Sequence, residues 1–193
     1  LKVQQSNNKL MATVNSFATA AEESGVVVEG KAFNLALNSV VKVLKEKVDS
    51  DVVLSFSTDL DEIKAKMIED VDKYSTDTSG VNIDPDDFET LSNSVELAIG
   101  NVITKIDTIQ YADVKAETTT AEDISDIFSV VNVLTTKVKD GASAYNKGGA
   151  LSIDMSDSVI TAVMANKVPT DMSVTSSFAE DKNDLIIGTV LTA

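Results

Sequence analysis

The sequence contains no cysteine and no histidine, and these two absences exclude several kinds of chemistry. Without cysteine there are no disulfides and no thiol nucleophile, and without both residues there is no conventional structural zinc site. Histidine is also the side chain most often used as a general base near neutral pH. The chain further lacks a glycine-rich phosphate loop and a G-x-S-x-G nucleophile motif. We therefore predict that it is not an enzyme.

Paired carboxylates offer a remaining route to hydrolysis, because glycosidases work with two acidic side chains. Here the acidic pairs fall on polar helix faces or at helix starts. Aromatic residues, which would hold a sugar, make up only 5% of the chain. A carboxylate-based hydrolase is therefore the less favoured alternative.

Arginine is also absent, and the 31 acidic residues outnumber the 16 lysines, which gives a net charge of −15. Proteins that bind nucleic acid or anionic membrane surfaces need cationic patches, so we predict neither partner. No apolar run approaches the roughly 18 residues that a membrane span requires, and no membrane insertion is expected. A strongly acidic surface instead suits a soluble protein in salty surroundings or one that collects divalent cations.

What the sequence does contain is a series of helical patterns, of which residues 84–109 form the clearest. Asp84 is suited to cap this helix and Pro85 to open it. Apolar residues recur every three or four positions, which places them on one helix face: Phe88, Leu91, Val95, Ile99, Val102, Ile106 and Ile109. Such a long apolar face needs other helices to cover it.

Further helices are expected at residues 2–23, 29–48, 59–74, 121–141 and 155–167, with Thr120 as the cap and Gly141 at the end of the fourth of these. Their expected inward residues are Val3, Leu10, Val14, Phe17 and Ala21; Phe33, Leu37, Val40, Leu44 and Val48; Leu60, Ile63, Met67, Val71 and Tyr74; and Ile124, Ile127, Phe128, Val131, Leu134 and Val138. Thr58 and Asp154 are the expected caps of the third and the last helix.

Two regions have a different pattern. Residues 52–56 fit either a short strand or a buried linker, and the residues after Pro169 alternate between apolar and polar side chains as a strand does. The predicted fold is therefore mainly α. A five- or six-helix bundle occupies residues 1–168, and a short C-terminal β segment, either a tail or the start of a following domain, occupies residues 169–193.

Residues 184–193 are apolar on both faces of the expected strand. Such a strand needs cover on both sides and partners for its backbone groups, and an isolated two-stranded hairpin is marginally stable. We therefore expect this segment to pair by strand addition with another copy of the chain or with neighbouring domains of the same protein.

Several clusters of acidic residues suggest calcium, which is bound by closely spaced carboxylate and carbonyl oxygens. The best of them combines loop carbonyls with Asn82, Asp84, Asp86 and Asp87. Other acidic pairs are Asp49 with Asp51, Asp59 with Asp61, and Asp70 with Asp72, and a further cluster joins Asp181, Asn183 and Asp184. None matches a complete EF-hand loop. Helix capping and a solvated surface explain each cluster as well, so no cofactor is predicted other than this candidate calcium ion.

Five segments resemble parts of very large secreted bacterial surface proteins of the RTX-adhesin and cadherin-repeat type. Residues 3–21 (VQQSNNKLMATVNSFATAA), 32–47 (AFNLALNSVVKVLKEK), 127–142 (IFSVVNVLTTKVKDGA) and 151–163 (LSIDMSDSVITAV) resemble helices of a module in those proteins. Residues 183–189 (NDLIIGT) are similar to the lead-in to RTX calcium-binding repeats, although the repeats themselves are missing. The resemblance implies a helical spacer or assembly domain, without enzymatic activity, in an exported protein at the bacterial surface.

The functional prediction is a non-catalytic structural or assembly domain of a secreted bacterial cell-surface or extracellular matrix protein, adhesin-like or filament-forming. The alternative is a module that uses its acidic face to bind calcium or a cationic partner.

Overall fold

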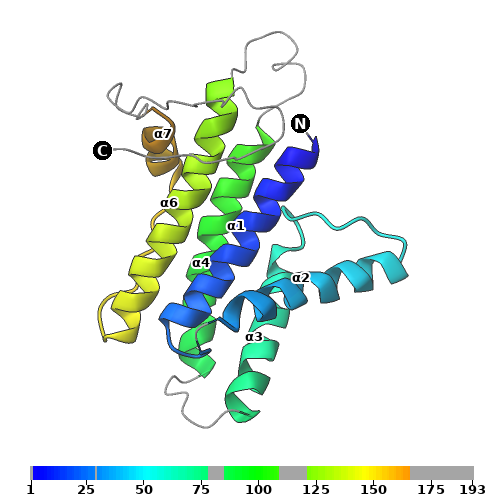
Figure 1. The fold of residues 1–193 in the computed structure, drawn as a ribbon, viewed down its shortest axis with the longest axis vertical. Coiled ribbons are helices and arrows are strands. Elements are labelled where there is room, and N and C mark those ends of the chain that lie inside the picture. Colours follow the sequence, from blue (N-terminus) through cyan, green and yellow to red (C-terminus); the bar gives the residue numbers. More distant parts are fainter. Residues whose placement is uncertain (1, 29, 78–84, 109–120, 166–193) are drawn as a thin grey trace, which may run out of the picture.

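The computed structural model describes residues 2–28, 30–77, 85–108 and 121–165. These residues form six helices: α1 (Lys2–Glu23), α2 (Ala32–Asp49), α3 (Leu60–Asp77), α4 (Pro85–Asp107), α6 (Ala121–Asn146) and α7 (Asp157–Ala165) (Figure 1). No strand occurs in this part of the chain, residues 52–56 included, so the predicted mainly α fold with five or six helices is confirmed for it. The predicted β tail at residues 169–193 lies outside the described residues.

Helix α1 lies at the centre of the bundle, where it packs against α2, α4 and α6 (Figure 1). Residues 12–21 are buried around almost the whole circumference of the helix, and most of them are small. Because the distance between packed helices depends on the side chains at the contact, alanines such as Ala12 and Ala20 allow close approach on several sides. Phe17 provides the large side chain of this segment and is also fully buried. Short residues in α1 therefore set how closely the other helices pack.

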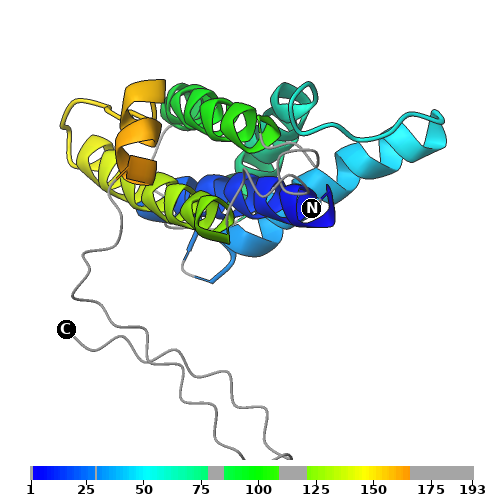
Figure 2. The same ribbon diagram turned by 90° about the horizontal axis from the view of Figure 1, so that it is seen from above.

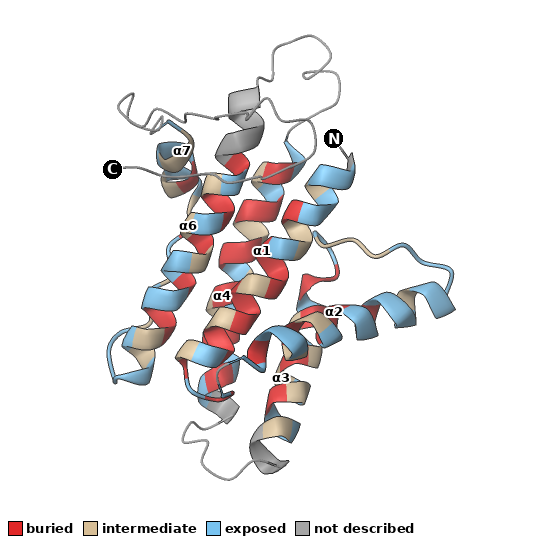
Figure 3. Ribbon diagram, viewed as in Figure 1, coloured by how far each residue is buried: buried red, intermediate tan, exposed pale blue. Residues whose placement is uncertain are grey.

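Helix α4 carries the apolar face that the sequence predicts. Leu91, Val95, Ile99 and Val102 are completely buried, and Phe88 and Ile106 nearly so. Figure 3 shows this buried face turned toward α1 and α6. Ile109, the last predicted member of the face, lies outside the described residues. The end of α4 is also fastened to the start of α1, since Gln5 Nε2 donates a hydrogen bond to the Ile106 carbonyl at 2.9 Å and Lys9 pairs with Asp107.

We predict that Leu91→Ala lowers the free energy of unfolding by about 2–5 kcal/mol, because it removes buried methyl groups and leaves a cavity. Leu97→Ala on the same helix is the matched control. Its side chain is 69% exposed, so the expected change is within about 0.5 kcal/mol. Urea denaturation followed by circular dichroism measures both. Equal losses for the two variants would contradict the assigned orientation of α4.

The inward face predicted for residues 29–48 is wrong in part. Helix α2 begins at Ala32 and packs on α1 and α3 through Ala32, Ala36, Ser39, Val40 and Val43. Of the five residues predicted to face inward, Val40 is buried and Leu37 is half-buried. The other three, Phe33, Leu44 and Val48, are exposed. Two other predicted core residues, Val3 and Phe128, are also exposed. The apolar pattern selects the face with the largest side chains, but α2 uses its small ones because they allow closer packing.

Helix α6 does not end at Gly141 as predicted but continues to Asn146. Gly141 lies inside the helix and is buried, and the segment that leads to α7 crosses directly over it. A Cβ atom at Gly141 would lie 2.6 Å from Ile153 Cγ1 and 2.8 Å from the Ser152 carbonyl oxygen. The turn after α6 instead uses Gly148, whose φ of +79° favours glycine.

Helix α7 begins two residues later than predicted, at Asp157. Asp154 still organises its start, because its Oδ1 accepts a hydrogen bond of 2.9 Å from the Ser156 amide. This bond holds the pKa of Asp154 below its ordinary value.

We predict opposite effects for two helical glycines. Gly141→Ala should destabilise the protein by about 1–3 kcal/mol, since the new methyl group overlaps the crossing segment. Gly100→Ala in α4 should instead stabilise it by roughly 0.5–1 kcal/mol, because a Cβ there meets no atom within 4 Å and alanine is the better helix former. Thermal unfolding of both variants tests the pair. A stabilising Gly141→Ala would refute the close crossing.

Candidate functional site

The structure describes only part of the candidate calcium site. Asn82 and Asp84 lie outside the described residues, and Asp86 and Asp87 fall in the first turn of α4. The Asp87 carboxylate accepts a hydrogen bond of 3.2 Å from the Tyr145 hydroxyl near the end of α6. Partial desolvation and this carboxylate raise the pKa of Tyr145 above its ordinary value. Asp87 therefore joins α4 to α6, and calcium binding by the four residues stays a prediction.

One of the other acidic pairs proposed from the sequence is divided between two lysines. Asp61 pairs with Lys64 at 2.8 Å, whereas Asp59 pairs with Lys47 at 3.1 Å. Asp70 pairs with Lys42 across the α2–α3 contact. Within the described part of the chain, no group of three or more acidic side chains is arranged to hold a metal ion. Asp59 and Asp70 thus bind lysines of α2, whereas Asp61 binds a lysine of its own helix.

Asp59 has the most contacts of these carboxylates. It directly precedes α3 and therefore holds the capping position that was predicted for Thr58. Its Oδ2 accepts the Ser55 amide at 2.8 Å, and its Oδ1 accepts the Thr58 hydroxyl at 3.2 Å. The Ser55 hydrogen bond, followed by the contact with Lys47, holds the pKa of Asp59 below its ordinary value. The carboxylate thereby fixes the return of the chain from α2 to α3.

We predict that Asp59→Asn lowers the free energy of unfolding by roughly 1–3 kcal/mol at pH 7, because the Ser55 amide and Lys47 lose a charged acceptor. The pKa of Asp59 is lower in the folded than in the unfolded chain. Its contribution is therefore complete above the unfolded pKa and is lost as the pH falls through the folded one. The difference in free energy of unfolding between the wild type and Asp59→Asn should therefore disappear in this acid range. Asp140→Asn, at an exposed position, is the control, and a gap that is constant down to acid pH would contradict the assignment.

The main exposed feature of the described structure is the outer face of α2. Five apolar residues, which we call the α2 stripe, follow one another at spacings of three and four: Phe33, Leu37, Val41, Leu44 and Val48. Phe33, Val41, Leu44 and Val48 are 45%, 50%, 42% and 62% exposed. Such spacing places all five on one side of the helix. The stripe is thus a second apolar face, distinct from the one that α2 buries against α1 and α3.

The second half of α2 extends beyond the bundle. Val43 is its last buried residue, and Figures 1 and 2 show the helix projecting past α1 and α3 before the chain turns back. The two residues Val52 and Val53, in the returning segment, are 51% and 87% exposed. Two exposed valines thus follow the exposed apolar residues of the helix in the chain. Large exposed apolar surfaces on soluble proteins mark sites of interaction with other proteins.

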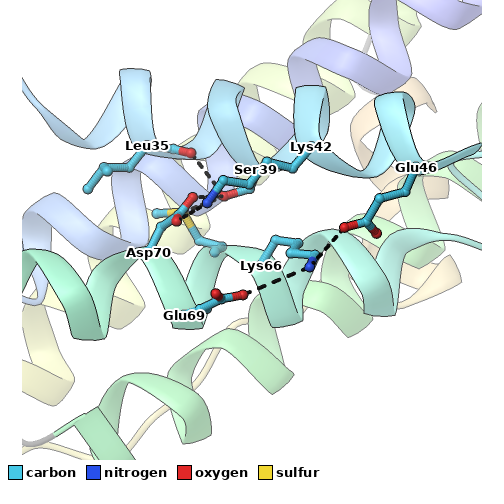
Figure 4. Close-up of polar contacts among 8 residues, drawn as sticks. Leu35, Ser39, Lys42, Glu46, Lys66, Glu69 and Asp70 are labelled. Carbon is cyan, nitrogen blue, oxygen red and sulfur yellow. Dashed lines mark hydrogen bonds and ion pairs between the residues drawn. The ribbon is translucent and has the colours of Figure 1, made fainter. Parts of the chain in front are cut away.

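Polar contacts fix the orientation of α2 and thereby keep the stripe outward (Figure 4). Ser39 donates to the Leu35 carbonyl at 2.9 Å and also lies 3.3 Å from Asp70 Oδ2. Lys66 of α3 pairs with Glu46 at 3.0 Å, and this hydrogen bond raises the pKa of Lys66. These contacts occupy the side of α2 that faces α3. The stripe cannot rotate inward without breaking them.

The projecting end is held to α3 by one further lysine. Lys47 pairs with Glu62 at 2.9 Å and with Asp59 at 3.1 Å, and both carboxylates raise its pKa. Lys45 lies beside the stripe and has no side-chain partner among the described residues. The candidate site is therefore an apolar helix face on a projection that ion pairs hold to α3, with a cationic side chain at its edge.

No family model, curated protein or solved structure matches the chain. The resemblance to secreted bacterial surface proteins accordingly stays a prediction. None of the described helices combines the length and the apolarity that crossing a membrane requires.

Proposed function

We propose that the chain is a non-catalytic structural and assembly domain that associates with other protein through the α2 stripe. The observation that carries this proposal is an apolar face of five residues on a helix that projects from the bundle. Amphipathic helices bind partners through anchors spaced in this way. The stripe is held outward by the contacts of Ser39 and Lys66, so it is available without rearrangement.

We further propose that this assembly takes place outside the cell, in a secreted bacterial cell-surface or matrix protein that is adhesin-like or filament-forming. Three features of the sequence support this proposal: the net charge of −15, the absence of cysteine and the resemblance of five segments to modules of such proteins. An acidic surface keeps a protein soluble at high concentration. Association must then come from a local surface of different character, which is what the α2 stripe offers.

The test of the proposal is whether association depends on the α2 stripe. We predict that the wild-type chain associates progressively over about a hundredfold range of concentration in sedimentation velocity. The double variant Val41→Gln, Leu44→Gln should remain monomeric, because glutamine removes apolar surface without adding charge or weakening the helix.

Phe128→Gln is the matched control, since Phe128 on α6 is 46% exposed, much like Leu44. It should associate as the wild type does. A wild-type chain that is monomeric at every concentration would overturn the proposed function. Equal association of the wild type and the double variant would show that another surface is responsible.

A further inference from the structure

A second surface feature combines open space with carboxylates, which an apolar helix face with a lysine at its edge requires of a partner. It is a groove between the start of α3 and the middle of α4, with a volume of about 490 Å³. We call it the α3–α4 groove and define it by Leu60, Asp61, Asn93, Glu96, Leu97 and Gly100. It shares no residue with the α2 stripe. One molecule therefore presents both surfaces at once.

The groove is open, and its exposed apolar side chain is Leu97. Leu97 is 69% exposed although it lies in the middle of α4, whereas Leu60 at the start of α3 is buried. A Cβ atom built at Gly100 meets nothing within 4 Å. The absence of a side chain at Gly100 leaves room for an incoming one, and the volume of the groove accommodates a short row of aliphatic side chains.

The charges of the two surfaces are complementary. Asp61, whose side chain is 76% exposed, and Glu96 share a single lysine, Lys64, at 2.8 and 2.6 Å. The carboxylates at the groove therefore outnumber the cation beside them. Residues 31–48, in contrast, contain four lysines and one glutamate in a chain of net charge −15. Helix α2 itself (Ala32–Asp49) contains three lysines against Glu46 and Asp49, and Lys42 and Lys47 already pair with carboxylates of the same chain. Lys45 is therefore the cation that the stripe can offer to the groove carboxylates.

We propose that the α2 stripe of one copy of the chain occupies the α3–α4 groove of a second copy. This inference rests on the proposed function and names the partner of the same site. Apolar side chains such as Val41 and Leu44 cover Leu97 and fill the space over Gly100. Lys45, which has no partner within the described part of its own chain, approaches the carboxylates at the groove edge.

The same charges disfavour the alternative in which two α2 helices pair with each other. Pairing of two α2 stripes brings the unpartnered Lys45 of both copies to one interface, and like charges in contact oppose association. Pairing of stripe with groove uses two different surfaces, so a bound pair still offers one free stripe and one free groove. Such an interface builds a ring or an open filament rather than a closed dimer.

Two half-blocked variants test this geometry. The stripe-blocked variant carries Val41→Gln and Leu44→Gln, and the groove-blocked variant carries Leu97→Gln and Gly100→Gln. All four positions are exposed or open in the structure, and circular dichroism checks that both variants fold. Each variant alone should be monomeric in sedimentation velocity. An equimolar mixture should form a one-to-one dimer, in which the intact stripe of one variant binds the intact groove of the other. The dimer should not grow further, because the stripe and the groove that it leaves unbound carry the blocking substitutions.

The outcomes separate the inference from the proposed function. Dimers of the groove-blocked variant alone would show that α2 pairs with α2, and a mixture that stays monomeric would show that the groove is not the partner. Either result overturns the inference while stripe-dependent association of the wild type stands. A monomeric wild type overturns both.

A charge variant provides a second test that leaves the shape of the groove unchanged. Asp61→Asn should raise the dissociation constant of self-association by about twofold to fivefold, as expected for one exposed ion pair. Asp140→Asn, which removes an exposed carboxylate on α6, should leave it unchanged. Equal effects of the two substitutions would contradict a specific role for the groove carboxylate.

Discussion

The fold depends on the close packing of α1 against several helices at once. Small residues such as Ala12, Ala20 and Ala21 leave room for α2, α4 and α6 around the same segment. Helix α2 packs against this segment through a face of small side chains, which includes Ala36 and Ser39. Because that face is the one that fits α1 and α3, the larger apolar residues of α2 remain on the outside. The exposed stripe is therefore a consequence of how the core is packed.

Lysines form the ion pairs between the described helices. The 31 acidic residues outnumber the 16 lysines about two to one, and three lysines of α2 and α3 each pair with two carboxylates: Lys47, Lys64 and Lys66. Exposed ion pairs contribute little stability individually, but here they fix the direction in which α2 projects. We propose that the excess acidic charge keeps copies apart except where the α2 stripe, with Lys45 at its edge, meets the carboxylates of the α3–α4 groove of another copy.

Much of this arrangement follows from the sequence. The apolar face of α4 is predicted correctly because its large residues are also its buried ones, from Phe88 to Ile106. Four of the five residues of the α2 stripe are found in the sequence too, but they are assigned to the core together with Val40, since periodicity shows that a face is apolar and not what covers it. Gly141 is wrongly predicted to end a helix. It is needed inside α6 because the segment that leads to α7 folds back over it at Ile153, and the sequence pattern does not reveal this crossing. The candidate calcium residues Asn82 and Asp84 and the β tail remain predictions.

The central claim is that another protein chain covers the α2 stripe. Amide hydrogen exchange of the full chain, followed by mass spectrometry at low and at high protein concentration, tests it most directly. The end of α2 projects from the bundle, so its amides should exchange readily in the monomer and more slowly when the stripe is covered. The account predicts slower exchange at high concentration in peptides that cover residues 41–53 and 93–101, with no change in α7. Exchange in residues 41–53 that is independent of concentration would contradict it.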